Sequence, residues 1–260
     1  MDAHFHPDGD WLVPTDLTRS PWAPEAQHGG PPLALVVRAA DSVMPKGMGV
    51  WRIAAEILRP IPHRPLRAAA RVVRPGKRVT LIESSLEDAE GPVVLGRVWV
   101  IRHRDPLDYP EPPDPWPEPP PPPETLGDTP FAFAAYTWFG DSLDTRVVEG
   151  AIDGLGRATA WFRLRVPVVA GEEPTPEQRL ATMVDSGNGI SWGLPFGEWL
   201  FINSDVTAYL LRRPAGEWFA MGAVSHYDRG GRGIAETRLF DQHGYLGRSH
   251  QALFVDELTQ

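Results

Sequence analysis

The chain contains 260 residues, of which 42% are hydrophobic, carries a formal net charge of -9 and has no cysteine. Its length suffices for one large domain or two modest ones. The lack of cysteine excludes disulfides, thiolate nucleophiles and cysteine-ligated metals. The acidic balance argues against general nucleic-acid binding, which needs a basic face, but it permits an anionic small ligand at a local arginine cluster.

The sequence shows no pattern for export or membrane insertion. Its N-terminus lacks a basic region followed by an apolar one, and no apolar run approaches membrane-spanning length. We therefore expect a soluble, cytoplasmic protein without a membrane span.

The first half predicts one buried helix followed by four strands. After a polar, turn-rich segment over residues 1–27, two prolines suit the first turn of a helix that continues through the apolar residues 33–40. Pro45 is expected to end this helix. A hairpin turn is expected at residues 75–77. The expected strands cover about residues 50–58, 66–74, 78–87 and 92–102.

A linker over residues 105–130 is expected to separate an N-terminal unit, 1–104, from a C-terminal unit, 131–260. Its many prolines favour a stiff polyproline II spacer; such a run can also bind an aromatic groove on another protein. The second helix is expected to be capped by Thr175 and to end near Ser186. The expected strands of this unit cover about residues 131–139, 146–152, 158–166, 199–211, 216–225, 233–241 and 246–255.

The second half repeats the plan of the first. Each half has an apolar run closed by Arg-Pro, and then an acidic residue, a leucine, an aspartate and a glycine at matching spacings. These positions are Glu83, Leu86, Asp88 and Gly91 in the first half, and Glu236, Leu239, Asp241 and Gly244 in the second. The repeat favours one α+β unit used twice, each sheet curled round its helix, with a ligand between the copies. Two β-meanders with similar turn residues are the alternative.

Residues 189–193 match the Gly-x-Ser-x-Gly pattern of a serine-hydrolase nucleophile elbow. The elbow needs a strand before the serine and a helix after it. Here a helix precedes Ser191 and a proline-containing loop follows. The context favours a loop serine over a nucleophile.

Three polar residues of the second half are candidates for acid–base chemistry. Asp185 is expected at the negative end of a helix dipole, which suits a general base better than a stabilising role, although a solvated loop aspartate also fits. Asn203 begins a polar stripe reaching Tyr209, which is either a buried functional face or a solvated one. Gln251, on the last strand, can orient a water molecule without carrying a charge.

The start of the first helix offers a second group of candidates. Backbone N–H groups near Gly29 and Gly30 can stabilise a carbonyl oxygen that gains charge, although both can also be ordinary turn glycines. His28 beside them is either a ligand contact or a capping residue. The other histidines lack metal-ligand spacing with acidic residues, so no metal and no cofactor is expected.

These segments carry a resemblance to a known family. Residues 28–40 resemble the Gly-Gly helix start of the acyl-CoA thioesterase II type, and residues 57–60 its Phe-Leu-Arg-Pro strand end. Residues 203–207 and 213–218 are similar to its Thr/Ser-x-Asp-x-Thr and Arg-Pro-x-Gly-Glu-Trp patterns. The resemblance spans about residues 22–255 and implies a tandem (double) hotdog fold, in which each half is a curved antiparallel sheet round one long buried helix.

The resemblance also implies a site. The family's catalytic aspartate, threonine or serine, and glutamine correspond to Asp185, Asn203 and Gln251, so Asn203 departs from the family's hydroxyl. The implied reaction is hydrolysis of an acyl-CoA by a water molecule that these three residues hold, with N–H groups near Gly29 and Gly30 at the oxyanion. A non-catalytic or weakly active acyl-CoA-binding protein of the same fold is the alternative.

Further expectations follow for the partners of this fold. Hydration of enoyl thioesters, with His28 as the candidate residue, is another reaction of hotdog proteins. Such sheets often pair again, so a homo-oligomer is one of the states that the sequence leaves open. The candidate contacts for the CoA phosphates are Arg74, Lys77, Arg78, Arg229 and Arg232.

Overall fold

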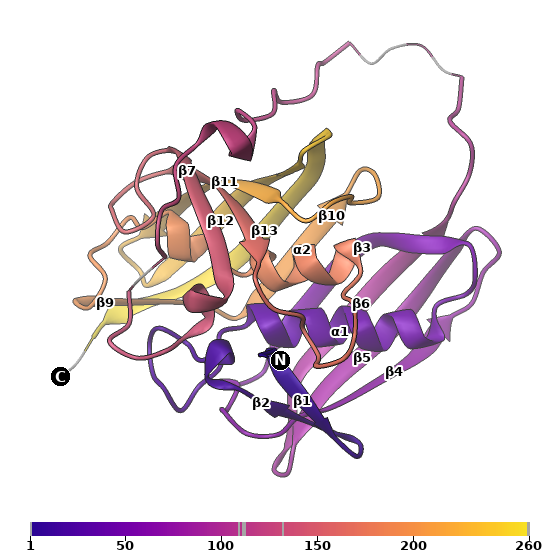
Figure 1. Ribbon diagram of the computed structural model, residues 1–260, viewed down its shortest axis with the longest axis horizontal. Coiled ribbons are helices and arrows are strands. Elements are labelled where there is room, and N and C mark those ends of the chain that lie inside the picture. The colour runs from indigo at the N-terminus through magenta and orange to yellow at the C-terminus, as the bar shows by residue number, and fades with distance from the viewer. Residues whose placement is uncertain (1, 109, 111–112, 132, 259–260) are drawn as a thin grey trace.

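The computed structural model describes residues 2–108, 110, 113–131 and 133–258. Within this part of the chain, two α-helices pack against an eleven-stranded sheet, and a small hairpin stands apart from it (Figure 1). The hairpin consists of β1 (Phe5–Asp8) and β2 (Trp11–Pro14), where the sequence predicted only a turn-rich segment. No described helix combines the length and apolar character needed to cross a membrane.

The first half contains the elements that the sequence predicted. Helix α1 spans Gly30–Val43, so it begins at the two prolines and ends before Pro45 as expected. The four strands are β3 (Met48–Ile57), β4 (Arg67–Arg74), β5 (Val79–Asp88) and β6 (Gly91–Arg102).

The second half contains helix α2, over Pro176–Val184, and seven strands. The Thr175 side chain accepts a hydrogen bond from the Gln178 N–H at 3.2 Å, which confirms the predicted cap. The strands are β7 (Leu143–Glu149), β8 (Ala158–Leu164), β9 (Trp199–Asn203), β10 (Asp205–Leu210), β11 (Phe219–Asp228), β12 (Arg232–Asp241) and β13 (Gly244–Glu257).

Two strand predictions for this half are wrong, one in part and one over all of its described residues. The single strand expected over 199–211 is broken at Ser204, where the register with β13 shifts by one residue: Asn203 lies opposite Leu253, whereas Thr207 lies opposite His250. Its two parts, β9 and β10, therefore pair with different stretches of β13. The described residues of the expected strand 131–139 form no strand, and residue 132 lies outside the described residues.

All large strands join in one antiparallel sheet. Its order is β4-β5-β6-β3-β10-β13-β12-β11-β8-β7, with β9 paired to β13. The two halves meet where β3 pairs with β10, with Ala54 opposite Thr207. The copies therefore share a continuous sheet, and their helices lie side by side against it.

The two helices are antiparallel and nearly in backbone contact. A Cβ atom at Gly30, at the start of α1, would lie 2.0 Å from the Thr182 carbonyl oxygen near the end of α2. At the other end of the pair, the Gln178 amide donates to the Asp41 carboxylate at 2.8 Å. Each helix start thus faces the end of the other helix.

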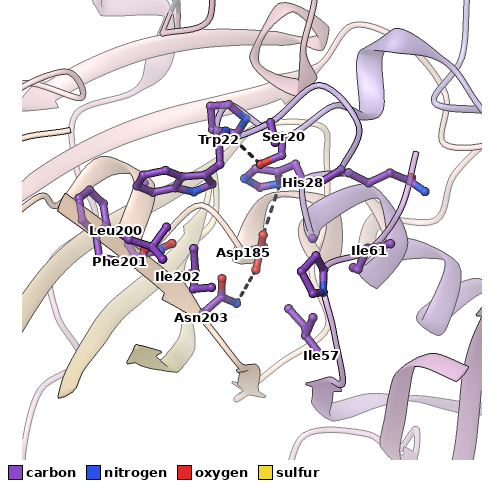
Figure 2. A pocket seen from close by; sticks show the side chains of 18 of the residues that line it. Ser20, Trp22, His28, Ile57, Ile61, Asp185, Leu200, Phe201, Ile202 and Asn203 are labelled. Atoms are coloured by element: carbon purple, nitrogen blue, oxygen red, sulfur yellow. Dashed lines mark hydrogen bonds and ion pairs between the residues drawn. The ribbon is translucent and has the colours of Figure 1, made fainter. Parts of the chain in front are cut away.

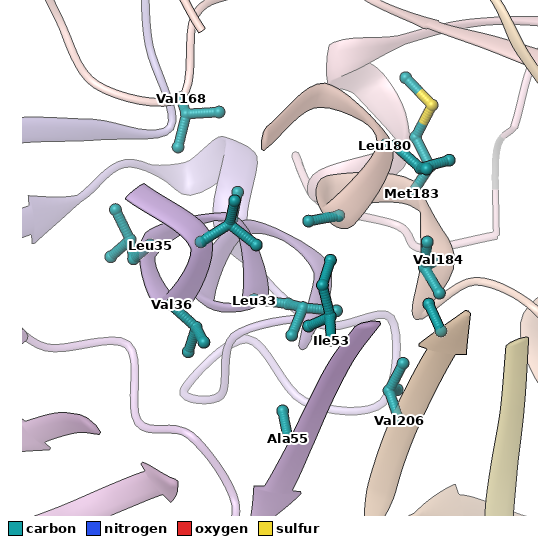
Figure 3. Close-up of a cluster of buried hydrophobic side chains, with 14 of the residues drawn as sticks. Leu33, Leu35, Val36, Ile53, Ala55, Val168, Leu180, Met183, Val184 and Val206 are labelled. Atoms are coloured by element: carbon teal, nitrogen blue, oxygen red, sulfur yellow. The ribbon is translucent and has the colours of Figure 1, made fainter. Parts of the chain in front are cut away.

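Apolar side chains from both halves fill the space between helices and sheet (Figure 3). Val36 of α1 and Met183 of α2 are completely buried with Ile53 of β3, and Val206 of β10 is almost completely buried. The core is therefore continuous across the junction of the two units.

The repeat is visible in a duplicated arginine–aspartate contact. In the first half, the Arg59 guanidinium donates to Asp88 at 2.6 Å and to the carbonyl of Gly91. In the second half, Arg212 donates to Asp241 at 2.7 Å and to the carbonyl of Gly244. Both aspartate side chains are almost fully buried, so each arginine neutralises a buried charge at the same hairpin turn.

The predicted linker is not a free spacer over its whole length. Trp116 stacks on Tyr245, and the Trp161 indole N–H donates to the Pro121 carbonyl at 2.8 Å. The C-terminal part of the proline-rich segment therefore covers the outer face of the second half of the sheet. Residues 109, 111 and 112 of the expected linker lie outside the described residues.

Candidate active site

Asp185 lies where the end of α2, from the second half, faces the start of α1, from the first half (Figure 2). It follows α2 directly, as the C-cap residue, and is 5% exposed. Its Oδ1 accepts a hydrogen bond from Asn203 Nδ2 at 2.8 Å, and its Oδ2 lies 3.4 Å from His28 Nδ1. A Cβ at Gly29 would lie 2.7 Å from Oδ2. Only glycine at position 29 leaves room for this carboxylate.

His28 is fixed by its own helix start. Its Nδ1 accepts a hydrogen bond from the Gly30 N–H at 3.0 Å, and its ring stacks on Phe139 at 4.4 Å between centroids. Burial lowers the pKa of His28 from its ordinary value, although the Asp185 carboxylate acts in the opposite direction. With Nδ1 as acceptor, a neutral His28 carries its proton on Nε2.

This geometry changes the expected role of Gly30. The sequence offered its N–H to a substrate oxygen, but His28 already accepts that N–H. The Gly30 position is required instead by the close approach to the Thr182 carbonyl. Among the described residues, the Gly29 N–H meets no acceptor, and Gly29 lines the cavity described below.

Asn203 ends β9 beside the carboxylate. The same Nδ2 that donates to Asp185 also lies 3.2 Å from the Asp205 carbonyl. Since the strand breaks directly after Asn203, the expected alternating stripe up to Tyr209 does not form one face of a single strand. Asn203 turns toward Asp185, whereas Tyr209 is half exposed on β10.

Gln251 lies behind Asp185, away from the cavity. It is 2% exposed, and its amide N–H₂ donates to the main-chain carbonyl of Asp185 at 3.0 Å. Its Oε1 accepts the Asn188 N–H at 3.0 Å. Both ends of the amide therefore hold the turn after α2, and Gln251 is not among the described residues that line the cavity.

A cavity of about 400 Å³ opens beside Asp185, between the two halves. Its lining contains one carboxylate, that of Asp185, among the described residues, and it is otherwise mainly apolar. The periodic patterns of the sequence indicated few of its aromatic walls, because most of these residues stand in irregular segments, although Phe201 lies in β9 and Phe254 in β13. They are Trp22, Phe131, Phe133, Trp138, Trp192, Phe196, Phe201 and Phe254.

Ser191 is not placed as a nucleophile. It is 1% exposed and its hydroxyl donates to the Gly187 carbonyl at 2.9 Å, while Ser225 Oγ lies 2.8 Å away. No histidine contacts it within the described residues. Its hydrogen bonds are those of a loop serine that closes the turn after α2.

The basic residues predicted for the CoA phosphates are all exposed and lie at two hairpins. The β4–β5 hairpin, with Arg74, Lys77 and Arg78, lies level with the Gly49 end of β3 but is separated from it by β6, whereas the other end of β3 lines the cavity. The β11–β12 hairpin, with Arg229 and Arg232, is closer, because Arg232 pairs with the cavity-lining Phe254.

His4 is part of the interior, although the sequence predicted only a polar, turn-rich segment over residues 1–27. It is completely buried, and its Nε2 lies 2.8 Å from Ser142 Oγ. Burial and the nearby His28 lower its pKa to about 3. Its ring lies 5.8 Å from Phe139, on which His28 also stacks. No group of three or more possible metal-ligating side chains occurs in the described residues.

Comparisons with known proteins agree with this architecture. The crystal structure of the acyl-CoA thioesterase II TesB2 from Mycobacterium marinum is similar with a TM-score of 0.66 and 18% identity, over 90% of this chain and 91% of that one. A conserved protein of unknown function with a hot dog fold from Alicyclobacillus acidocaldarius gives 0.71 and 16%, over 97% and 95%. The tesB protein of Mycobacterium avium subsp. paratuberculosis gives 0.66 and 15%, over 95% and 94%. These similarities confirm the expected α+β double hotdog fold.

The sequence itself matches two family descriptions in succession. Residues 18–101 match the acyl-CoA thioesterase N-terminal domain, and residues 110–255 match the acyl-CoA thioesterase C-terminal domain. No curated protein matches the chain. Because the C-terminal match alone covers more than half of the residues, the chain belongs to the acyl-CoA thioesterase family.

Proposed function

We propose that this protein hydrolyses acyl-CoA thioesters in the cavity beside Asp185. The observation that carries the proposal is the placement of this carboxylate. It lines a mainly apolar cavity of about 400 Å³ and faces a glycine of the other half, with no intervening side chain. A carboxylate held beside a bound thioester can act as a general base toward water.

The first step uses Asp185 as the base. Oδ2 takes a proton from a water molecule, and the water oxygen forms a bond to the thioester carbonyl carbon. The π electrons of the carbonyl move to its oxygen, which becomes an oxyanion. Collapse of this intermediate breaks the C–S bond, so that the products are a carboxylic acid and the CoA thiolate, which takes up a proton from Asp185 or solvent.

The oxyanion donors belong to the start of α1. Since the Gly30 N–H is bound to His28, we assign this role to the Gly29 N–H together with His28 Nε2–H. Burial keeps His28 neutral near pH 7 by lowering its pKa, so it donates without adding a positive charge beside the base. Removing one donor of this type typically lowers the rate by a factor of about 100–1,000.

Asn203 and Gln251 then have different roles. Asn203 donates to Oδ1 and orients the carboxylate, so that Oδ2 faces the substrate. Gln251 acts through the main chain, since its amide binds the Asp185 carbonyl and the Asn188 N–H. Asn203 is therefore a positioning residue next to the base, and Gln251 positions the turn that carries it.

The test is release of free CoA, measured with a thiol-reactive dye. The chain has no cysteine, so the protein itself gives no background. Asp185→Asn should lower kcat by at least about 100-fold while the fold is kept. The matched control is Asp41→Asn, which changes the other helix-end carboxylate and should leave the rate close to that of the unmodified protein.

The same assay decides between hydrolysis and binding alone. If the unmodified protein and Asp185→Asn bind an acyl-CoA equally well and release CoA equally slowly, the protein is a binding module. The proposal of catalysis is then wrong, and the departure of Asn203 from the family hydroxyl is its natural explanation.

A further inference from the structure

The aromatic side chains of the cavity form a connected wall. Trp192 stacks on Phe196, with 5.2 Å between centroids and 20° between planes, and it lies 4.9 Å from Phe133. Trp22 lies 4.6 Å from Phe196 and meets Phe201 edge-on at 5.0 Å and 85°. Rings from three separate segments therefore surround one volume, and they include one stacked pair and one edge-on pair, the geometries that aromatic rings prefer.

The aromatic wall lies on one side of the carboxylate. In Figure 2, Trp22 and Phe201 stand with Leu200 and Ile202 on one side of Asp185, and Ile57 and Ile61 stand on the other. A thioester carbonyl placed at Asp185 therefore has aromatic rings on one side and only aliphatic side chains among the labelled residues on the other.

The aromatic side is closed at its inner end. Phe201 is 1% exposed and Trp192 is 7% exposed, so their rings form the inner wall of the cavity, whereas the cavity-lining Phe254 is 51% exposed. On the aliphatic side, Pro60 and Ser204 line the cavity and are exposed. The pantetheine arm of CoA must reach solvent, which leaves the closed aromatic side for the acyl group.

Size and chemistry then restrict the acyl group. A cavity of about 400 Å³ lies near the lower end of the range for small-molecule sites, about 300–1,000 Å³. A long alkyl chain exceeds this space together with the thioester, whereas a single ring fits it. Rings packed edge-on or offset against other rings gain more than the burial of an alkyl group of equal area gives.

We propose that the preferred acyl group ends in a neutral aromatic ring, as in a phenylacetyl thioester. This inference rests on the proposed hydrolysis and names its substrate class. The charged side chains of the described lining are Asp185, at the reacting carbonyl, and Arg59, which is bound to Asp88. The closed end therefore accepts an uncharged ring.

The experiment compares kcat/KM for phenylacetyl-CoA, cyclohexylacetyl-CoA, octanoyl-CoA and palmitoyl-CoA. The first three have equal numbers of acyl carbons, and cyclohexylacetyl keeps the ring shape without the π electrons. We expect phenylacetyl-CoA to exceed cyclohexylacetyl-CoA by about fivefold, a typical gain from aromatic contacts. Palmitoyl-CoA should be the poorest substrate.

Substitutions in the aromatic wall test whether individual rings cause the preference for phenylacetyl-CoA. Trp22→Leu and Phe196→Leu replace partly exposed side chains and should move the phenylacetyl-to-cyclohexylacetyl ratio toward one. The matched control is Trp116→Leu, because this tryptophan packs on Tyr245 outside the cavity and its loss should leave the ratio unchanged. A ratio that is equal in all variants, or a preference for octanoyl-CoA over phenylacetyl-CoA, overturns the inference and leaves the hydrolase intact.

A binding measurement separates the two proposals if no thioester is hydrolysed. Non-hydrolysable thioether analogues of phenylacetyl-CoA and cyclohexylacetyl-CoA can be titrated against the fluorescence of the cavity tryptophans. Tighter binding of the aryl analogue supports the aromatic acyl site while the proposed hydrolysis fails. Equal binding of the two analogues overturns the aromatic preference as well.

Discussion

The carboxylate of Asp185 occupies the space that a side chain at Gly29 would fill. Asp185 belongs to the second half of the chain and Gly29 to the first, so the candidate base and its facing main-chain N–H come from different copies of the repeat. The antiparallel helix pair holds them in this relation. Several consequences of this arrangement can be measured.

Gly29→Ala should impair catalysis more than folding. The added Cβ would lie 2.7 Å from Asp185 Oδ2 and 2.9 Å from its Cγ, so the whole carboxylate must move, which a side chain can do without a shift of the main chain. Displacement of a catalytic group by about 1 Å can lower the rate about 100-fold. We expect such a fall in kcat with little change in the urea midpoint. Gly127→Ala, where no atom lies within 4 Å of the added Cβ, is the matched control; equal activity of the two variants would contradict the geometry.

Gly30→Ala should instead impair folding. Its Cβ would lie 2.0 Å from the main-chain carbonyl of Thr182, which cannot move without shifting α2. Overpacking of this kind destabilises proteins by about 1–3 kcal/mol, which exceeds the gain of up to about 1 kcal/mol from alanine's helix propensity. Urea unfolding at neutral pH measures the loss. An unchanged or higher free energy of unfolding would show that the helices can separate easily.

Asn203→Leu should lower kcat by about 10- to 100-fold. The leucine keeps the approximate size but removes the donor to Asp185 Oδ1, and a hydrogen bond to a charged group contributes about 1.5–3 kcal/mol. Asn203→Thr restores a hydroxyl donor, as in the family pattern, and should retain more activity than the leucine variant. Full activity of Asn203→Leu would remove Asn203 from the positioning of the base.

Acid should weaken the fold through His4. Its pKa is lowered from 6.5 to about 3 by burial and by His28, so between these values the unfolded chain binds a proton that the folded chain does not. The free energy of unfolding therefore falls as the pH falls through this window, by about 2 kcal/mol between pH 7 and pH 5 from His4 alone. Urea unfolding at both pH values measures the change, and His4→Gln should reduce it by this amount. An equal pH effect in the variant would place the acid sensitivity elsewhere.

Much of the architecture could be predicted from local pattern. Helix α1 has prolines at its start and an apolar surface on nearly all sides, and β5 alternates strictly between buried and partly exposed positions. The β1–β2 hairpin was missed because β1 is also held by the other half of the chain, where the Phe5 N–H donates to the Val168 carbonyl. The break at Ser204 was missed for the same reason, since its hydrogen bonds join three strands.

The sequence predicted residues of the site but not their arrangement, because the arrangement depends on contacts between residues that are distant in the sequence. The resemblance brought Asp185 and Asn203 together, and the structure places them in hydrogen-bond contact. The resemblance could not show that the Gln251 amide forms its hydrogen bonds with main-chain groups of the turn after α2, namely the Asp185 carbonyl and the Asn188 N–H. The cavity rings, such as Trp22 and Phe196, come from loops whose positions no periodicity describes.

The antiparallel helices create two corners where a helix end meets a helix start. At one corner Asp185 faces a cavity; at the other, Asp41 accepts a hydrogen bond from Gln178. In an assembly of two identical subunits, any substitution would alter both corners at once. In a single polypeptide the two corners have independent sequences. A substitution can therefore change the corner at Asp185, which faces the cavity, without changing the corner at Asp41, whose carboxylate binds Gln178.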